Sequence, residues 1–277
     1  MTDSFSRRRV LSYLAAGAAC PVCASLAGRA FGAVEKAAAA AHGADQAAGH
    51  GGGAPHWGYD GAGGPDNWGT LSADFKVCDL GLEQTPIDLA STVRAELAGV
   101  ESMFQDSALT VVNNGHTIQA NCAAGNYSLI GGERFELLQF HFHHPSEHKL
   151  AGQAFPLECH FVHRSQAGTL AVLGVFIRAG ASHDALEVVF QAMPAAAGGE
   201  QPAARPLNPN ALLPFDRGHF RYAGSLTTPP CSEGVNWVVY KTAIEASDAQ
   251  IQKFAAMFPL NARPIQKQNR RFLLESL

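Results

Sequence analysis

The stretch Gln139-Phe140-His141-Phe142-His143 alternates polar and aromatic residues, and this alternation indicates a β-strand. Successive side chains of a strand point to opposite faces of a sheet, so the two histidines share one face and the two phenylalanines the other. Two imidazoles on one strand face can chelate a single metal ion. The segment therefore predicts a sheet with an aromatic face turned to the core and a metal site on the opposite face.

A second segment, Glu158-Cys159-His160-Phe161-Val162, supplies what the first one lacks. An open tetrahedral zinc site has three protein ligands and keeps its fourth position for water, and His160 is the third candidate ligand. Glu158 lies on the same face of its strand and can accept the free ring N–H of a ligating histidine, as can the amide oxygen of Gln139. A single histidine would be read as a core or surface residue. Three of them in apolar surroundings, with a carboxylate, are costly to bury without a metal.

Strand patterns dominate residues 55–277, which we read as one domain. They occupy residues 109–112, 135–143, 157–163, 170–177 and 235–240. Two helices are expected, one from near Ser182 to Met193 and one beginning at Ser247, where Gln250 completes a capping box. The fold class predicted is mainly β (α+β), a large sheet with peripheral helices.

The first 54 residues differ in composition from the rest. Residues 1–32 read as a signal peptide, and the pattern Ser6-Arg7-Arg8-Arg9-Val10-Leu11 is typical of the twin-arginine export route. An ordinary secretory signal with an extra arginine and lipid attachment at Cys20 or Cys23 are the alternatives. Residues 33–54 are rich in Ala, Gly and His and read as a flexible linker. We therefore expect a periplasmic or secreted protein.

Charge and composition exclude several functions. The 277 residues are 47% hydrophobic and 16% charged, which suits a folded domain. The net charge is −4, without a basic block beyond the N-terminus, so a nucleic-acid partner is not expected. No apolar run after the signal is long enough to cross a bilayer. Four cysteines follow the signal, and they allow three full pairings among which the sequence does not choose. Monomer and homodimer are both left open.

These motifs, taken in order, resemble the α-class carbonic anhydrases, in particular the exported bacterial type. The resemblance runs from His56 to Gln266 and rests on Gln84-Thr85-Pro86-Ile87, Asn113-Asn114-Gly115-His116, the histidine stretch, Ser146-Glu147-His148, Leu226-Thr227-Thr228-Pro229-Pro230 and Asn261-Ala262-Arg263-Pro264. It implies a twisted, mostly antiparallel sheet of ten strands, with zinc at the base of a conical cleft. The implied zinc ligands are His141, His143 and His160.

The resemblance also implies an activity, the reversible hydration of carbon dioxide to bicarbonate and a proton. Zinc lowers the pKa of a bound water, an effect for which these enzymes are a standard example, and the resulting hydroxide attacks the substrate. Glu147 is expected to orient the hydroxyl of Thr227, which accepts the hydrogen of the hydroxide. His116 matches the family's proton shuttle, since imidazole titrates near neutral pH.

Further positions match the family's supporting residues. An apolar substrate pocket is implied at Val162, Val172, Leu226, Val235 and Trp237, with Thr228 beside it. A water network is implied at Tyr59, Asn114 and Gln119, and Asn261 joins Gln139 and Glu158 around the ligands. His144 replaces a tryptophan common in animal relatives and should point away from the metal. The resemblance also implies a disulfide between Cys78 and Cys231, with Cys159 a buried thiol and Cys122 unpaired.

Two other functions remain open at this stage. An inactive relative that binds zinc is one, although such proteins have usually lost a ligand histidine. A periplasmic zinc buffer or adhesin that uses the fold only for binding is the other. Carbon dioxide hydration measured with and without a chelator separates these possibilities.

Overall fold

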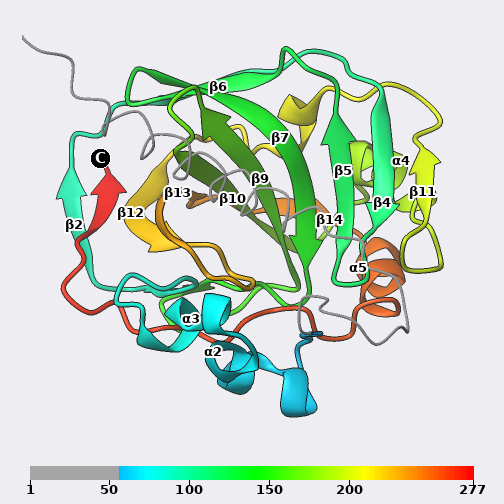
Figure 1. Cartoon of the computed structure of the whole chain (residues 1–277). Coiled ribbons are helices and arrows are strands. Elements are labelled where there is room, and N and C mark those ends of the chain that lie inside the picture. Colours follow the sequence, from blue (N-terminus) through cyan, green and yellow to red (C-terminus); the bar gives the residue numbers. More distant parts are fainter. Residues whose placement is uncertain (1–55) are drawn as a thin grey trace, which may run out of the picture.

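A computed structural model describes residues 56–277 of the chain, and one large twisted sheet dominates it (Figure 1). The predicted signal peptide and linker lie outside the described residues. The strands are β1 (Asp88–Leu89), β2 (Thr92–Ala95), β3 (Val100–Met103), β4 (Leu109–Asn113), β5 (Ile118–Cys122), β6 (Tyr127–Ile130), β7 (Glu133–His143), β8 (Lys149–Leu150), β9 (Leu157–Ser165), β10 (Leu170–Ala179), β11 (Glu200–Pro202), β12 (His219–Ser225), β13 (Glu233–Tyr240), β14 (Ile244–Ala246) and β15 (Leu273–Ser276). The α-helices are α2 (Trp68–Leu71), α3 (Val77–Leu80), α4 (Asp184–Gln191) and α5 (Asp248–Ala255).

The strand order confirms the predicted class. Within residues 56–277 the main sheet has 13 strands, and its principal path runs β11-β4-β5-β7-β9-β10-β13-β12-β15-β2. This path has the ten strands that the resemblance implied, and β3, β6 and β14 branch from it. Most pairs are antiparallel, and the parallel exceptions are β10 with β13, β10 with β14, and β15 with β2. All five predicted strand segments are strands, with ends within two residues of those expected.

The predicted aromatic face is buried. Phe140, Phe142 and Phe161 are fully buried in the main hydrophobic core. The two longer helices cover this face, because the ring of Phe142 lies 5.2 Å from that of Phe190 on α4 and 6.0 Å from that of Phe254 on α5. The histidine face is thus left to the other side of the sheet, as the alternation requires.

The two predicted helices form, but one begins later than expected. Helix α5 has the full capping box between Ser247 and Gln250. Helix α4 begins at Asp184 instead of near Ser182, and its N-cap His183 makes no side-chain cap. The backbone N–H of His183 donates to Gln250 Oε1, 3.0 Å away. A residue of α5 therefore stabilises the start of α4, which no local pattern around Ser182 could indicate.

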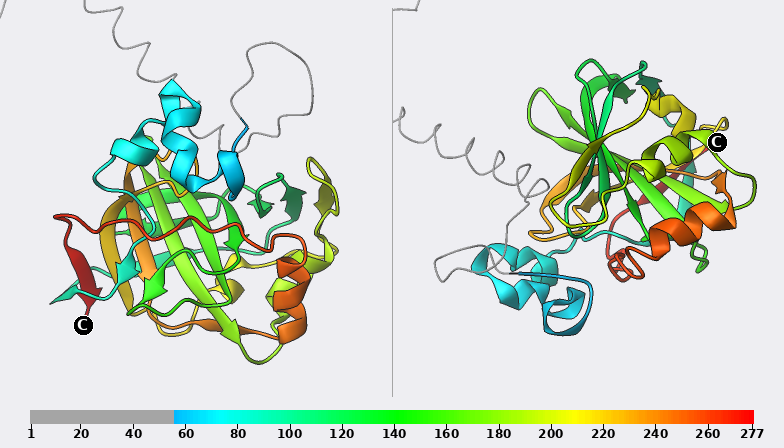
Figure 2. Two further views of the ribbon diagram at one scale, coloured as in Figure 1. Left: turned by 90° about the horizontal axis from the view of Figure 1, so that it is seen from below. Right: turned by 90° about the vertical axis from the view of Figure 1, so that its right-hand side faces the viewer.

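The short helices α2 and α3 lie together away from α4 and α5 (Figure 2). They are joined to the sheet by the disulfide that the resemblance implied, between Cys78 on α3 and Cys231 after β12. Among residues 56–277 Cys122 and Cys159 have no disulfide partner, and Cys159 is buried, also as expected. Among residues 56–277 no helix has the length and apolar character that crossing a bilayer would need.

Candidate metal centre

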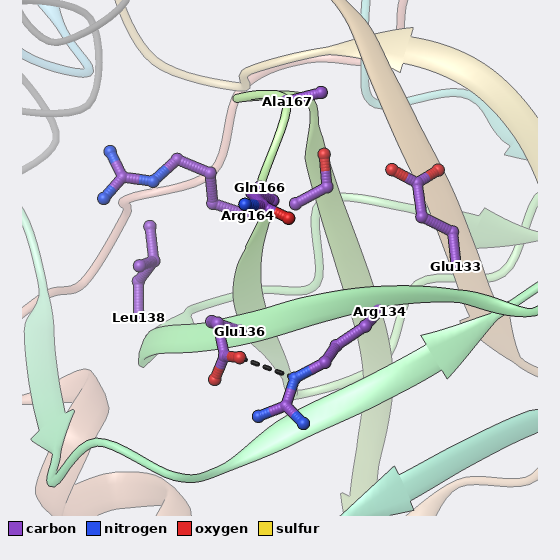
Figure 3. A pocket seen from close by; sticks show the side chains of 8 residues that line it. Glu133, Arg134, Glu136, Leu138, Arg164, Gln166 and Ala167 are labelled. Carbon is purple, nitrogen blue, oxygen red and sulfur yellow. Dashed lines mark hydrogen bonds and ion pairs between the residues drawn. The ribbon is translucent and has the colours of Figure 1, made fainter.

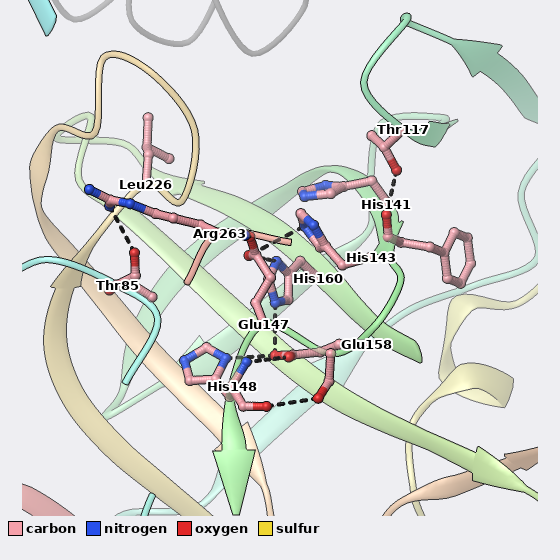
Figure 4. Close-up of polar contacts among 12 residues, drawn as sticks. Thr85, Thr117, His141, His143, Glu147, His148, Glu158, His160, Leu226 and Arg263 are labelled. Carbon is pink, nitrogen blue, oxygen red and sulfur yellow. Dashed lines mark hydrogen bonds and ion pairs between the residues drawn. The ribbon is translucent and has the colours of Figure 1, made fainter. Parts of the chain in front are cut away.

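The register of two strands brings the three histidines together. Strand β7 pairs with β9 so that His141 lies opposite His160, and His143 is two residues further along β7. The ring centroids are 5.0 Å apart for His141 and His143, 5.4 Å for His141 and His160, and 4.6 Å for His143 and His160. One ring nitrogen of each histidine lies within 4.8 Å of the other two (Figure 4).

The remaining nitrogen of each ring is held by an acceptor. His141 Nδ1 donates to Gln139 Oε1 at 2.8 Å, and His160 Nε2 donates to Glu158 Oε1 at 2.8 Å. His143 Nδ1 donates to the main-chain oxygen of Asn261 at 2.7 Å. A neutral imidazole that donates from one nitrogen has its lone pair on the other. The free lone pairs are therefore on Nε2 of His141, Nε2 of His143 and Nδ1 of His160.

These residues fit a metal ion. Burial holds the pKa of His141 well below its usual value, that of His143 at about 4, and lowers that of His160. All three are thus neutral near pH 7, the form that binds metals. His143 Nε2 is buried and has no hydrogen-bond partner among the described residues. Three neutral imidazoles with acceptors fixed behind them are the ligand set of an open zinc site.

Glu147 lies next to the three nitrogens without belonging to their set. Its Oε2 is 3.8 Å from His160 Nδ1, and its Oε1 accepts the backbone N–H of Arg263 at 2.9 Å. Burial raises the pKa of Glu147 to about 7, and the neighbouring His160, the backbone N–H of Arg263 and, to a smaller extent, the Thr227 side chain oppose this rise. The structure thus brings together the carboxylate and the hydroxyl that the sequence paired.

An apolar wall adjoins the third histidine. Val162, Val172, Val235 and Trp237 belong to one buried cluster, and Leu226 packs against it. Val172 pairs across the sheet with Val162 on β9 and with Trp237 on β13. The ring of Trp237 lies 4.9 Å from that of His160, so this wall extends to the histidines. Thr228 is on the neighbouring loop, and its carbonyl accepts the backbone N–H of Cys231 at 2.8 Å.

The environment of His116 differs from the expectation for a shuttle. Its ring stacks on Trp57, with centroids 3.8 Å apart and planes within 6°. Burial, with a smaller contribution from His56, lowers its pKa to about 4 rather than leaving it near neutral. Asn114, expected in the water network, uses Oδ1 to accept the backbone N–H groups of His116 and Thr117.

Gln119 and Tyr59 are the other two residues of the expected water network. Gln119 pairs with His141 across β5 and β7, and its Nε2 donates to Asn121 Oδ1 at 2.7 Å. Burial, together with the charge of Glu147, raises the pKa of the Tyr59 hydroxyl well above its usual value. His144 donates from Nδ1 to the Pro259 carbonyl at 3.0 Å, so its ring makes a hydrogen bond outside the histidine group.

For two supporting residues, His148 and Asn261, the structure adds the atoms through which they act. His148 is fully buried and joins Glu158 Oε1 at 2.7 Å to the hydroxyl of Tyr222 at 2.6 Å. Because these bonds occupy its nitrogens, the group of His148, Glu158 and His160 is a hydrogen-bond network around one candidate ligand, His160. Asn261 holds His143 through its main-chain carbonyl, a group that every residue carries and that therefore leaves no sequence signal.

A surface hollow of about 810 Å³ lies away from the histidines, where the first residues of β7 meet the last residues of β9 (Figure 3). The ion pair of Arg134 with Glu136, with Nε 2.7 Å from Oε1, forms one side of it. Its lining contains no residue predicted to act in the metal centre; it consists of Glu133, Arg134, Glu136, Leu138, Arg164, Ser165, Gln166 and Ala167.

Comparison with known proteins identifies the family. Residues 63–276 match the family model described as eukaryotic-type carbonic anhydrase. The chain belongs to this family. A carbonic anhydrase of Nostoc sp. is 47% identical over 232 residues, which cover 80% of this chain and 86% of that protein. The α-carbonic anhydrase of Thermovibrio ammonificans, solved with the inhibitor sulfanilamide, has a TM-score of 0.79 at 44% identity over 80% of this chain and all of that one.

Family membership gives the class of the protein, which is an enzyme of the carbonic anhydrase type, a lyase. The family also includes proteins known under other names. Dioscorin DB3L of Dioscorea polystachya is 36% identical over 73% of this chain and 79% of its own length. The carbonic anhydrase fold therefore does not by itself decide how each member uses its site, and the roles of single residues rest on the geometry described above.

Proposed function

We propose that the protein binds one zinc ion through His141, His143 and His160 and catalyses the reversible hydration of carbon dioxide to bicarbonate. The observation that carries this proposal is the convergence of three neutral imidazoles, each with its second nitrogen bound to an acceptor at 2.7–2.8 Å. Fixed acceptors set both the tautomer and the direction of each ring. Zinc bound there would supply a Lewis acid that activates water.

Glu147 and Thr227 select and orient the group that reacts. In this proposal the Thr227 hydroxyl donates its hydrogen to the neighbouring Glu147 carboxylate, which leaves the Thr227 oxygen to act as an acceptor. It therefore holds a nucleophile that carries a hydrogen and directs the lone pair of that nucleophile toward the substrate. The Glu147 carboxylate is held in place because its Oε1 accepts a hydrogen bond from the backbone N–H of Arg263.

The apolar wall binds the uncharged substrate. Carbon dioxide carries no charge and makes weak hydrogen bonds, so a pocket formed by Val162, Val172, Leu226, Val235 and Trp237 suits it, with Thr228 at its edge. Bicarbonate is charged and better solvated, which favours its departure from the same surface.

His116 is proposed to carry the proton to solvent, with Tyr59, Asn114 and Gln119 ordering the intervening water. The ring is stacked on Trp57, and burial, with a smaller contribution from His56, holds its pKa at about 4, so it is a weak base in this position. Movement of the ring away from Trp57 would expose it to solvent and bring its pKa back toward the ordinary value.

We further propose that the protein is exported to the periplasm or beyond, with residues 1–32 removed and 33–54 serving as a linker. The disulfide and the bacterial relatives support export, since disulfides persist in oxidising compartments. We expect a variant with Arg7→Lys and Arg8→Lys to accumulate as precursor in the cytoplasm, because the twin-arginine receptor reads the arginine pair. Unchanged export in cell fractionation would favour the ordinary secretory route.

Stopped-flow hydration of carbon dioxide tests the enzymatic proposal. The purified protein should be active, lose activity with a zinc chelator and regain it when zinc is added back. His143→Ala should lose both zinc, measured by elemental analysis, and activity. A zinc buffer would instead bind the metal stoichiometrically and leave the hydration rate at that of the buffer alone, as would an inactive relative.

A further inference from the structure

Arg263 has a buried guanidinium that binds three acceptors. The residue is 3% exposed and lies in the segment between α5 and β15. Its Nη2 donates to the carbonyl of Cys78 at 2.8 Å, and its Nη1 donates to the carbonyl of Thr85 and to Gln84 Oε1, both at 2.9 Å. Burial lowers the pKa of Arg263 to about 10, so it is still charged at neutral pH.

The same residue holds the carboxylate of the metal centre. The backbone N–H of Arg263 donates to Glu147 Oε1 at 2.9 Å, while Glu147 Oε2 faces His143 Nε2. Figure 4 shows the Arg263 side chain extending from this point to Thr85. The guanidinium and the backbone N–H belong to one residue. The hydrogen bonds of the guanidinium therefore restrict the direction in which the backbone N–H of Arg263 points.

The disulfide and the threonine loop join the same network. Gln84, which accepts from Arg263, donates from Nε2 to the carbonyl of Cys231 at 3.1 Å. The backbone N–H of Cys231 in turn donates to the carbonyl of Thr228, the neighbour of Thr227. Cys78 is therefore hydrogen-bonded to Arg263, and Cys231 is hydrogen-bonded to Gln84, which itself accepts from Arg263. Arg263 thus connects the disulfide, the threonine loop and the Glu147 carboxylate.

We propose that Arg263 is a positioning residue, which anchors its own backbone to the disulfide segment and thereby sets the Glu147 carboxylate against Thr227. This inference rests on the proposed function, in which that pair orients the nucleophile. The planar guanidinium of arginine can donate to acceptors on separate segments at the same time, whereas the ammonium of lysine is a compact charge on a flexible side chain. Arg263→Lys therefore keeps the charge and removes the anchor.

The kinetic test is a double-mutant cycle. Arg263→Lys should retain one zinc per chain and lose about tenfold in kcat/KM. Combined with Glu147→Gln, it should cause no loss beyond that of Glu147→Gln alone, because it acts through the same carboxylate. Arg271→Lys is the matched control, because Arg271 also binds carbonyls, at Ala223 and Gln84, but touches neither Glu147 nor Cys78. Losses that multiply in the double variant would overturn the proposal.

A structural test does not depend on activity. In a crystal structure of Arg263→Lys the Glu147 carboxylate should have left the position it holds in the wild type, and an unmoved carboxylate would overturn the proposal. If this variant does not fold, Gln84→Met removes one acceptor at similar side-chain volume and is examined for the same displacement. An inactive wild-type protein would refute the proposed function alone, whereas the position of Glu147 in the variants still decides the role of Arg263.

Discussion

Glu147 Oε2 lies 3.5 Å from His143 Nε2, and both atoms are buried without a hydrogen-bond partner among residues 56–277. A carboxylate this close to the nitrogens of the proposed metal ligands could be taken for a fourth ligand. However, its other oxygen is committed to Arg263, and its pKa is raised to about 7 by burial. We therefore assign it to orientation of the nucleophile and not to metal binding.

This assignment predicts that Glu147→Gln and Thr227→Ala keep their zinc and lose activity. Preorganised hydrogen-bonding groups of this kind contribute roughly 100-fold or more to a rate, and we expect a loss of that order in kcat/KM. Elemental analysis and stopped-flow hydration of the same samples provide the measurement. Zinc content that fell in step with activity would show that the residues hold the metal instead.

His116→Ala should lower the maximal turnover in dilute buffer and leave kcat/KM nearly unchanged, because proton transfer to solvent is separate from attack on carbon dioxide. The pKa of about 4 makes His116 a poor base against Trp57, so we expect a loss on the order of 10-fold, below the usual range for such groups. Imidazole buffer should restore the rate. If His116→Ala turned over at the wild-type rate in dilute buffer, another group would carry the proton to solvent.

The disulfide between Cys78 and Cys231 closes a loop of 153 residues. In the chain-entropy model, a loop of this length stabilises the folded state by roughly 5 kcal/mol, less any strain. We expect Cys78→Ser to lower the free energy of unfolding by several kcal/mol in urea titrations. Cys122→Ser, which removes a free thiol, is the control and should change it little. Peptide mapping without reductant that left Cys78 free would contradict the pairing, and a peptide linking Cys122 to Cys159 would contradict the two free thiols.

His163 predicts a loss of stability in acid that is independent of the metal. It is fully buried between Ser128 and the Phe161 carbonyl, and burial lowers its pKa from 6.5 to about 4. The unfolded chain therefore binds a proton between these values that the folded chain does not, and stability falls as the pH drops through this window. The difference corresponds to about 3 kcal/mol.

We expect metal-free His163→Gln to show a flatter dependence of unfolding free energy on pH between 6.5 and 4 than the metal-free wild type. Chelator-treated protein is used so that release of zinc does not contribute to either curve. Parallel curves for the two proteins would place the acid-sensitive group elsewhere.

The sequence alone determined the strands, their faces and the candidate ligands. Alternation with a period of two is a local property, so the sharing of one face by His141 and His143 followed from the chain without knowledge of its neighbours. The same holds for the capping box of α5, which is complete within four residues. The family resemblance then added the cysteine pairing and the roles of single residues.

Only the tertiary structure decided what depends on register and on distant main-chain groups. The pairing of β7 with β9 places His160 opposite His141, and a shift of one residue would have turned the histidines to opposite faces. The stacking of His116 on Trp57 and its low pKa depend on two segments that meet in space. The acceptor of His143 and two of the acceptors of Arg263 are carbonyls, which every residue has, so the folded path of the chain alone selects which of them is used.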